Sequence, residues 1–238
     1  MKKIWNYYTD NFGLTIFHPQ YFMNKFNNQS VELVKSYSIN KDVIDFGCGR
    51  MTYKNNLLES SKSYFGIDHP TESKNYLSDH KPDLLTSFEN TKLPSNWYST
   101  AMMFEVLEYL DNPQVVLDEI YRLLKKNSKF VMTSPFMYPI HDGNINKNRF
   151  TGSKIKDLLN NSKFKKIKII QQGNFFIFLT ISTLTYIFKK INNMNNLFKL
   201  LLIPIGLSIS IFLNIITLPF QKIKDDDFPI NILAIGEK

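Results

Sequence analysis

A short apolar segment that runs into a glycine turn, followed by a second segment that ends in an acid, constrains this chain most. Residues 43–49 read VIDFGCG and residues 64–68 read YFGID. Gly47 and Gly49 have no Cβ, so the backbone can turn sharply there and approach a ligand closely. Asp68 follows the turn by about twenty residues, a distance at which an acid accepts hydrogen bonds from two ribose hydroxyls. The pattern predicts a nucleoside bound at the carboxyl ends of parallel strands.

The charge inside the turn narrows the kind of nucleoside. Asp45 lies where a dinucleotide-binding loop usually has a neutral residue or glycine near the phosphates. A carboxylate attracts a positively charged ligand strongly in a partly dry cleft. The alternative interpretation is a chance glycine turn.

With these residues the chain resembles the class I S-adenosylmethionine-dependent methyltransferases, whose first motif is acid-x-Gly-x-Gly. The resemblance extends from about residue 31 to 151, through FEVLEYL at residues 104–110, where the family often has EVLEH, and through the helix and strand that follow. It implies S-adenosylmethionine as the cofactor. The residues it implies for cofactor binding are Asp45, Gly47, Cys48, Gly49, Asp68, Ser87, Phe88 and Phe104.

Three positions depart from the family pattern. Met51 stands where a third glycine is usual, and Trp97-Tyr98-Ser99 replaces a Ser-Phe-Asp signature. The segment GCGRMTY at residues 47–53 resembles the loop GCGxxPY of a branch that is frequent among enzymes modifying glycan or lipid precursors, with Thr52 in place of the proline. In the loop after the fifth strand, Asn146 replaces an acid.

The same branch resembles the loop of residues 135–151, where His141, Arg149, Phe150 and Thr151 match. In this fold the loop commonly covers the methyl acceptor. The resemblance makes His141 the candidate general base, because the pKa of an unperturbed histidine lies near 6.5, and Arg149 the candidate for orienting an anionic acceptor. The alternatives are a loop histidine that satisfies backbone groups and an arginine that pairs with an acid.

Other polar groups near the predicted site receive lesser roles. Tyr109 and Tyr138 are weaker catalytic candidates, and Glu89 is a weaker choice than Ser87 for the adenine region. Glu108 is expected to be a solvated acid at a helix start.

Strands alternate with helices along the chain, which predicts a doubly wound α/β fold with a mostly parallel, seven-stranded Rossmann-like sheet. Helices are expected at residues 21–37, 54–61 and 113–126. Strands are expected at residues 42–46, 64–67, 84–88, 100–104, 130–134, 164–170 and 228–235. The predicted parts are an N-terminal helical segment (1–40), the cofactor-binding core (41–172), a hydrophobic hairpin (173–224) and the last core strand (225–238).

The hairpin prediction rests on two uncharged apolar runs, residues 174–188 and 200–220. The second run is long enough to cross a bilayer. However, the strands on either side of the two runs are expected to pair, so both ends of the insertion lie on one side of a membrane. The first run spans only about 22 Å, less than the roughly 30 Å of the hydrocarbon layer. A helical hairpin that dips into one leaflet therefore fits best, with lysines near its ends facing anionic headgroups. The alternatives are a buried subdomain, a dimer interface or two full crossings.

Composition limits the partners. The net charge of +8, from 29 basic and 21 acidic residues, fits a membrane surface or a biased composition. Nucleic acid is not expected, because the chain has three arginines and lacks an aromatic-basic recognition motif. The single cysteine, Cys48, fits a reducing compartment, and no metal is expected.

These features predict a methyltransferase in the cytoplasm, peripheral or monotopic at the inner face of the membrane. The expected acceptor is a lipid-linked glycan precursor, or otherwise a quinone or other small lipid. The competing hypothesis is a non-catalytic membrane-associated module that keeps the fold. Oligomeric state and the methylated atom stay open.

Overall fold

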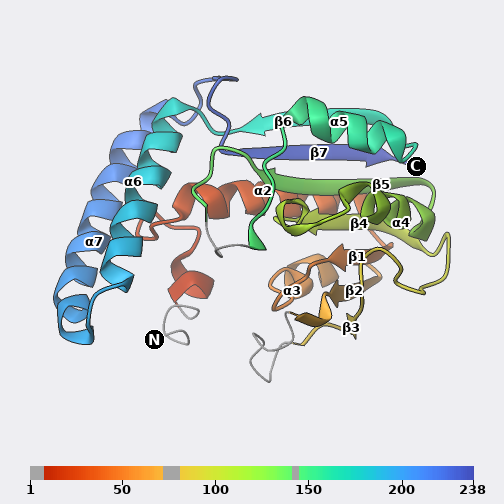
Figure 1. The fold of residues 1–238 in the computed structure, drawn as a ribbon, viewed down its shortest axis with the longest axis horizontal. Coiled ribbons are helices and arrows are strands. Elements are labelled where there is room, and N and C mark those ends of the chain that lie inside the picture. Colours follow the sequence, from red (N-terminus) through yellow and green to blue (C-terminus); the bar gives the residue numbers. More distant parts are fainter. Residues whose placement is uncertain (1–7, 72–80, 141–144) are drawn as a thin grey trace. The chain divides into compact units, whose positions relative to one another are not determined.

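The computed structural model describes residues 8–71, 81–140 and 145–238. Its strands form one seven-stranded sheet with the order β3-β2-β1-β4-β5-β7-β6 (Figure 1). Strands β1 to β5 pair in parallel, and Figure 1 shows β7 running opposite to its neighbour β6. The sheet is therefore mixed and mostly parallel, which confirms the predicted fold class.

The elements follow the predicted order closely. The strands are β1 (Asp42–Phe46), β2 (Ser63–Asp68), β3 (Leu84–Leu85), β4 (Tyr98–Phe104), β5 (Leu124–Pro135), β6 (Lys165–Gln172) and β7 (Asn231–Glu237). The helices are α2 (Tyr21–Tyr37), α3 (Lys54–Leu58), α4 (Pro113–Leu123), α5 (Gly152–Asn161), α6 (Phe175–Asn192) and α7 (Asn196–Thr217), with the 3₁₀ turns η2 (Leu107–Tyr109) and η4 (Leu218–Phe220).

The described residues form two compact units. One unit, which we call the sheet unit, comprises residues 29–71, 81–136, 145–170 and 232–238. The other, the hairpin unit, comprises residues 8–28, 137–140 and 171–231. The predicted domain boundaries were drawn along the sequence, whereas both units are assembled from segments that are separated in the chain. Those boundaries stay predictions.

The core of the sheet unit has two layers because side chains of a strand alternate between its faces. Ile44 and Phe46 of β1 belong to one apolar cluster with residues of α4 and α5. Val43, from the same strand, belongs to the other cluster with Val34 of α2 and Leu57 of α3. Helices on both faces of the sheet bury all of these strand residues, so the unit is doubly wound.

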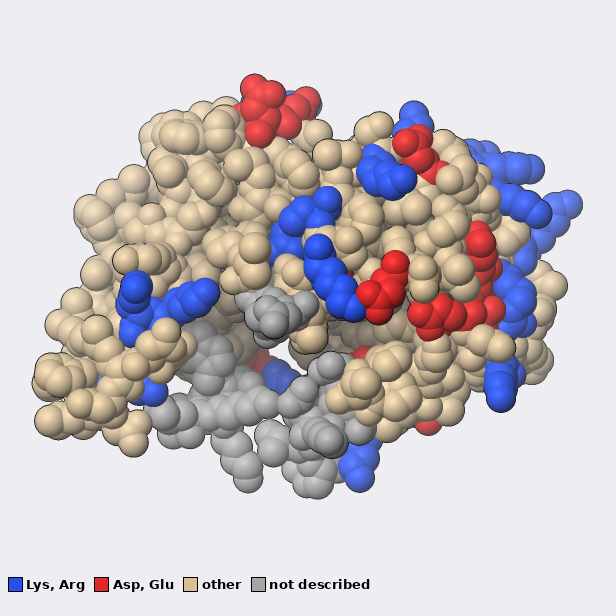
Figure 2. All heavy atoms as spheres, in the orientation of Figure 1, with Lys and Arg blue, Asp and Glu red and all other residues tan. Residues whose placement is uncertain are grey.

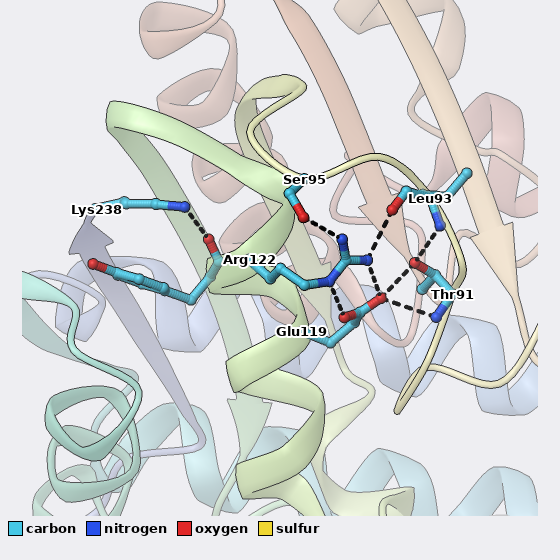
Figure 3. A network of polar contacts seen from close by, with 7 residues as sticks. Thr91, Leu93, Ser95, Glu119, Arg122 and Lys238 are labelled. Atoms are coloured by element: carbon cyan, nitrogen blue, oxygen red, sulfur yellow. Dashed lines mark hydrogen bonds and ion pairs between the residues drawn. The ribbon is translucent and has the colours of Figure 1, made fainter.

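A polar network fixes α4 against the segment that leads into β4 (Figure 3). Arg122 donates to both oxygens of Glu119 at 2.7 and 2.8 Å, to Ser95 Oγ at 2.6 Å and to the Leu93 carbonyl at 2.9 Å. The amide and hydroxyl of Thr91 also donate to Glu119, at 2.9 and 2.6 Å. Because Glu119 is only 8% exposed, these bonds offset the cost of burying its charge.

The hairpin unit contains the two apolar runs as antiparallel helices, α6 and α7, placed in sequence between β6 and β7. Asn174 begins α6 as its N-cap, accepting from the amide of Ile177, and Asn195 begins α7 in the same way. Gly206 allows the helices to approach closely, since a Cβ there would lie 3.1 Å from Ile191 Cδ1. Within the described residues, the stretch Asn196–Phe220 is the one helix long and apolar enough to cross a membrane by length and composition.

Candidate cofactor site

The predicted glycine turn lies between the carboxyl ends of β1 and β2. The amides of Gly47 and Cys48 donate to the carbonyl of Ile67 at 2.9 and 3.1 Å, which ties the turn to β2. Gly47 has φ +73° and Gly49 has φ +54°, backbone conformations that glycine adopts without a Cβ clash. Met51, in the position of the family's third glycine, also has a left-handed φ of 51°.

The space around the two glycines differs. A Cβ on Gly47 would lie 2.3 Å from Val106 Cγ2, so Gly47 is required for packing inside the protein. A Cβ on Gly49 would meet nothing within 4 Å, so the backbone of this residue borders open space. A ligand can therefore approach the turn at Gly49, as the sequence predicts.

Asp68 is held in place by backbone donors at the end of β2. The amide of Gly49 donates to its Oδ2 at 2.9 Å, and the amide of His69 donates to its Oδ1 at 2.7 Å. Each carboxylate oxygen can accept more than one hydrogen bond. The two amides therefore fix the orientation of the Asp68 carboxylate, which is 6% exposed.

Asp45 is almost fully buried, with 3% of its surface exposed. Tyr64 donates its phenol proton to Asp45 Oδ2 at 2.5 Å. Burial raises the pKa of Asp45 to about 7, the Tyr64 hydrogen bond opposes this rise, and the nearby charge of Asp68 adds to it. A cation bound beside Asp45 would favour the ionised carboxylate.

The end of β4 completes this side of the sheet. Phe104 is 8% exposed and packs edge-on against Tyr53, with 5.9 Å between the ring centroids. The next residue, Glu105, has a left-handed φ of 54° and accepts from Thr133 Oγ1 of β5 at 2.7 Å. Burial, with the charges of Asp45 and Glu105, raises the pKa of Tyr53, so its phenol stays protonated.

Cys48 is buried beside Gly66, whose missing side chain leaves room for the sulfur: a Cβ on Gly66 would lie 2.8 Å from Sγ. Burial raises the pKa of the Cys48 thiol, and the negative charges of Asp45, Asp68 and Asp83 raise it further. The neutral thiol is a poor nucleophile, so the geometry assigns Cys48 to packing within the turn.

Phe88 and Ser87, the residues predicted for the adenine region, make contacts within the protein. Phe88 is 5% exposed and packs against Phe46, with the ring centroids 5.7 Å apart, while His69 lies edge-on to it at 6.1 Å. The Ser87 hydroxyl donates to the carboxylate of Glu89. Their contact with a cofactor stays a prediction.

The loop after β5 is tied to the segment after β4. The amides of Lys147 and Asn148 both donate to the carbonyl of Glu108 at 3.0 Å, and Asn148 Nδ2 donates to the Leu110 carbonyl at 2.9 Å. Glu108 is fully buried in η2, so the expectation of a solvated acid was wrong. The turn that joins β4 to α4 draws this residue into the protein beneath the loop.

Of the two predicted catalytic residues, one can be placed. Arg149 donates to the Asn146 side chain and, at 2.8 Å, to the Asn148 carbonyl, so it is held within the loop after β5. His141 lies outside the described residues. Tyr109 belongs to η2, whereas Tyr138 belongs to the hairpin unit and accepts from Gln20 at 3.0 Å. No group of three metal-ligating side chains occurs in the described ranges.

Two contributors to the site were not predicted from the sequence. Tyr64 reaches Asp45 because the parallel register pairs Asp45 with Gly66, which puts Tyr64 on the same face of the sheet. Asp83 accepts from the Gly66 amide at 2.8 Å. The alternation of side chains along the predicted second strand could have identified Tyr64, whereas Asp83 comes from a polar segment without a pattern.

Comparison with known proteins agrees with this geometry. Residues 44–132 match the family model described as a methyltransferase domain. No curated protein matches the chain. Among solved structures, an S-adenosylmethionine-dependent methyltransferase from Archaeoglobus fulgidus superposes with a TM-score of 0.56 at 15% identity, covering 91% of this chain and 100% of its own.

Two further structures illustrate how far the likeness extends. The phosphoethanolamine N-methyltransferase 2 of Haemonchus contortus, in complex with S-adenosyl-L-methionine, has a TM-score of 0.57 at 12% identity and covers 97% of this chain and 59% of its own. The [4+2]-cyclase SpnF has a TM-score of 0.54 at 11% identity, and the match covers 93% of this chain and 85% of SpnF. The strand order, the acidic glycine turn and the matched domain together define a class I methyltransferase fold. At these identities the structural likeness establishes the fold alone. The reaction is inferred from the residues of the site.

Proposed function

We propose that this protein is an S-adenosylmethionine-dependent methyltransferase that acts at a membrane surface. The observation that carries the cofactor assignment is the turn between Asp45 and Asp68. It combines a buried acid, an acid oriented by two backbone amides, and open space at Gly49. These residues fit a cofactor with a ribose and a positive charge.

The chain's own residues would do the following. Asp68 holds the ribose, and the Gly47–Gly49 backbone leaves room for the close approach of the nucleoside. Ionised Asp45 stabilises the cationic end of the cofactor through space. The cofactor, when bound, supplies a methyl group on a sulfonium, and in-line displacement of such a group depends mainly on positioning and exclusion of water.

A base is needed when the acceptor is a hydroxyl or a similar weak nucleophile. His141 would be this base. It would take the proton from the acceptor hydroxyl as the hydroxyl oxygen forms its bond to the methyl carbon. Arg149 would orient an anionic acceptor from the loop after β5. Support for this part comes from the hydrogen bonds that hold this loop against the segment after β4.

A lipid-linked glycan precursor is the first proposed acceptor, followed by a quinone or other small lipid. The hairpin unit would attach the protein to the cytoplasmic face of the membrane. Two features support attachment: α7 is apolar enough to cross a bilayer, and only 22% of its most apolar window is buried.

The first experiment is calorimetric titration of the detergent-solubilised protein with S-adenosylmethionine and with its demethylated product. Asp68→Asn and Asp45→Asn should weaken binding at least tenfold. Asp42→Asn, at the opposite end of β1, is the matched control and should bind as the wild type does. A folded protein that binds neither compound would overturn the cofactor proposal.

Membrane attachment is tested separately by flotation with liposomes in the absence of detergent. The protein should float with the vesicles. A protein that stays soluble and does not float would overturn the membrane part while leaving the cofactor part intact.

The alternative is a non-catalytic membrane-associated module. The observation that favours it is the set of departures from the family pattern at Met51, Ser99 and Asn146. Absence of cofactor binding in a folded protein that floats with liposomes would select this alternative.

A further inference from the structure

The buried side of α7 carries small and polar residues. Gly206, Ser210, Asn214 and Thr217 are the four buried residues of the helix, and their spacing of three to four puts them on one side. Asn214 Nδ2 donates to the carbonyls of Ile16 and His18 at 2.8 and 3.0 Å. The Thr217 hydroxyl lies 2.6 Å from that of Thr180 on α6.

The outer side of α7 is apolar apart from Ser208, whose hydroxyl donates to the Pro204 carbonyl of the same helix at 3.0 Å. Leu201 is 59% exposed, Ile205 55%, Phe212 62% and Ile216 47%. Figure 2 shows a surface over α6 and α7 that is largely uncharged, with basic side chains gathered toward its lower end. A surface helix of a soluble protein has the opposite arrangement, with its apolar stripe facing inward. An apolar strip of this length marks a surface that contacts a membrane or another protein.

The N-terminal segment and the start of α2 cover the inner side of the hairpin near its base. Asn214 contacts the N-terminal segment, and Phe22 and Phe26 of α2 pack against Ile177 and Ile181 in the first turns of α6. The uncharged part of α7 beyond this cover, residues 200–213, spans about 21 Å. That length does not cross the roughly 30 Å of a hydrocarbon layer.

The tip of the hairpin is basic and polar. Lys189 and Lys190 are exposed in the last turn of α6, and residues 192–196, four of which are asparagine, are exposed between the helices. Entry of the hairpin tip-first into one leaflet would bring these groups into hydrocarbon, where charged side chains are costly. At the base, Lys222 and Lys224 are exposed as well.

We propose that α7 lies parallel to the membrane surface, with its outer face at the boundary between headgroups and acyl chains. The lysines at both ends of the hairpin, Lys189 and Lys190 at the tip and Lys222 and Lys224 at the base, contact anionic headgroups. This orientation rests on the membrane attachment proposed above. It explains why most residues on one side of α7 are exposed and apolar, while Gly206, Ser210, Asn214 and Thr217 on the other side are buried.

The orientation is tested by the depth of single spin labels in phosphatidylcholine–phosphatidylglycerol vesicles. The labelled variants are Leu201→Cys, Ile205→Cys, Phe212→Cys and Ile216→Cys, with Asn193→Cys at the tip. Wild-type protein is the labelling control, because Cys48 is only 7% exposed. The four outer labels should lie at one shallow depth, about 5–10 Å below the headgroups, and the tip label should remain in water on the side where protein was added.

A depth that increases steadily from Ile216 to Leu201, or a tip label protected from impermeant reductant, would overturn the parallel orientation. Strong spin–spin coupling between copies in vesicle-free solution, with a dimer mass by light scattering, would assign the strip to a second copy instead. Absence of flotation contradicts the membrane attachment itself, so the two failures are distinguishable.

The headgroup contacts are tested by Lys189→Gln/Lys190→Gln. Each lysine near an anionic surface contributes about a fivefold factor, so loss of both should lower vesicle affinity about 25-fold. Lys154→Gln/Lys156→Gln, which removes two exposed lysines of α5, is the matched control and should change affinity by less than about threefold. Equal losses in the two double variants would show that only net charge matters and would overturn the assigned contacts.

Discussion

The phenol of Tyr64 donates a 2.5 Å hydrogen bond to the buried carboxyl of Asp45, joining the start of β2 to the end of β1. The register between the strands brings the two side chains to one face. A buried acid with a single phenolic donor is costly to ionise, which is why burial raises its pKa to about 7. Stability and cofactor affinity should therefore both depend on this one proton.

We predict that Asp45→Asn changes the pH dependence of stability. Between about pH 4 and 7 the carboxyl is protonated in the folded protein and ionised in the unfolded chain. Its contribution is therefore present at low pH and is lost as pH rises to about 7. The loss corresponds to roughly 4 kcal/mol at most. Urea unfolding from pH 4 to 8 should show that the free energy of unfolding of the variant increases relative to that of the wild type as pH rises. If the two free energies change in parallel with pH, the assignment is contradicted.

The same proton should govern ligand binding in the proposed site. A cationic cofactor prefers ionised Asp45, so the affinity of the wild type for S-adenosylmethionine should rise through pH 7. The affinity of Asp45→Asn should be weak and nearly independent of pH. Calorimetry at pH 6 and pH 8 measures both; an identical rise in the variant would assign the pH dependence to another group.

Arg122→Lys should destabilise the sheet unit by about 1–3 kcal/mol, because a lysine cannot reproduce the four donated bonds of the guanidinium. Burial raises the pKa of Glu119, but the bonds from Arg122 and Thr91 outweigh burial and hold the pKa below its ordinary value. The contribution of this carboxylate is thus present above the unfolded pKa and is lost as pH falls through the folded one.

Chemical denaturation at pH 7 measures this effect. The control is Glu59→Gln, which breaks an ion pair with Lys35 whose acid is 67% exposed. Exposed pairs contribute little, so the control should match the wild type. A loss in Arg122→Lys no larger than in the control would show that the network does not stabilise the fold.

Strong periodicity made most of the fold predictable. The predicted bounds of α2 and β1 agree with the structure. Phe22, Phe26, Val31 and Val34 lie near the helix period, and β1 is a short, mostly apolar run that ends at the glycine turn. α5 was missed: its buried residues, Ile155, Leu158 and Leu159, are few and lie among lysines and asparagines. The cap at Thr151 was the available signal, since its side chain accepts from the Lys154 amide. The start of β5 at Leu124 was also missed, because LKKNS has no strand alternation.

The candidate site was predictable where backbone geometry dictates the residue type. Gly47, Gly49 and Asp68 follow from the turn and strand pattern alone. The partner of Asp45 was not predicted: alternation along the second strand gives the face on which Tyr64 lies, and the register of the two strands then brings Tyr64 to Asp45. The direction of the hairpin's polar stripe was equally hidden: the sequence shows that α7 is apolar, but the contacts of Asn214 show which side faces the protein.

Asn174 and Asn195 form a matched pair of helix caps in the hairpin unit. Each accepts from the third amide of its helix at 3.1 Å. Asn174 is also 1% exposed and donates to the carbonyls of Phe220 and Ile223 at 2.9 and 3.0 Å.

Asn195→Ala should therefore cost about 1 kcal/mol, the value of a cap. Asn174→Ala should cost about 2–4 kcal/mol, because the hydrogen bonds to the carbonyls of Phe220 and Ile223 are lost together with the cap. Thermal unfolding in mild detergent compares the two variants, and equal losses would show that the contacts to residues 220 and 223 do not stabilise the base of the hairpin.

Gly47 and Gly49 should separate folding from binding. Gly47→Ala places a Cβ 2.3 Å from Val106 Cγ2 at a left-handed φ of 73°, so Val106 must move within a packed core. We expect a loss of about 2–4 kcal/mol in stability. Gly49→Ala meets no neighbouring atom, so only backbone strain of about 1–2 kcal/mol applies.

The new methyl of Gly49→Ala, however, occupies the open space that the proposed cofactor would use. This variant should fold nearly as well as the wild type and bind S-adenosylmethionine at least tenfold more weakly. Urea unfolding and calorimetry on both variants decide the matter. If Gly49→Ala retains full affinity, the cofactor does not approach the turn there, and the ligand must be held by the strand-end acids without close contact to the glycine backbone.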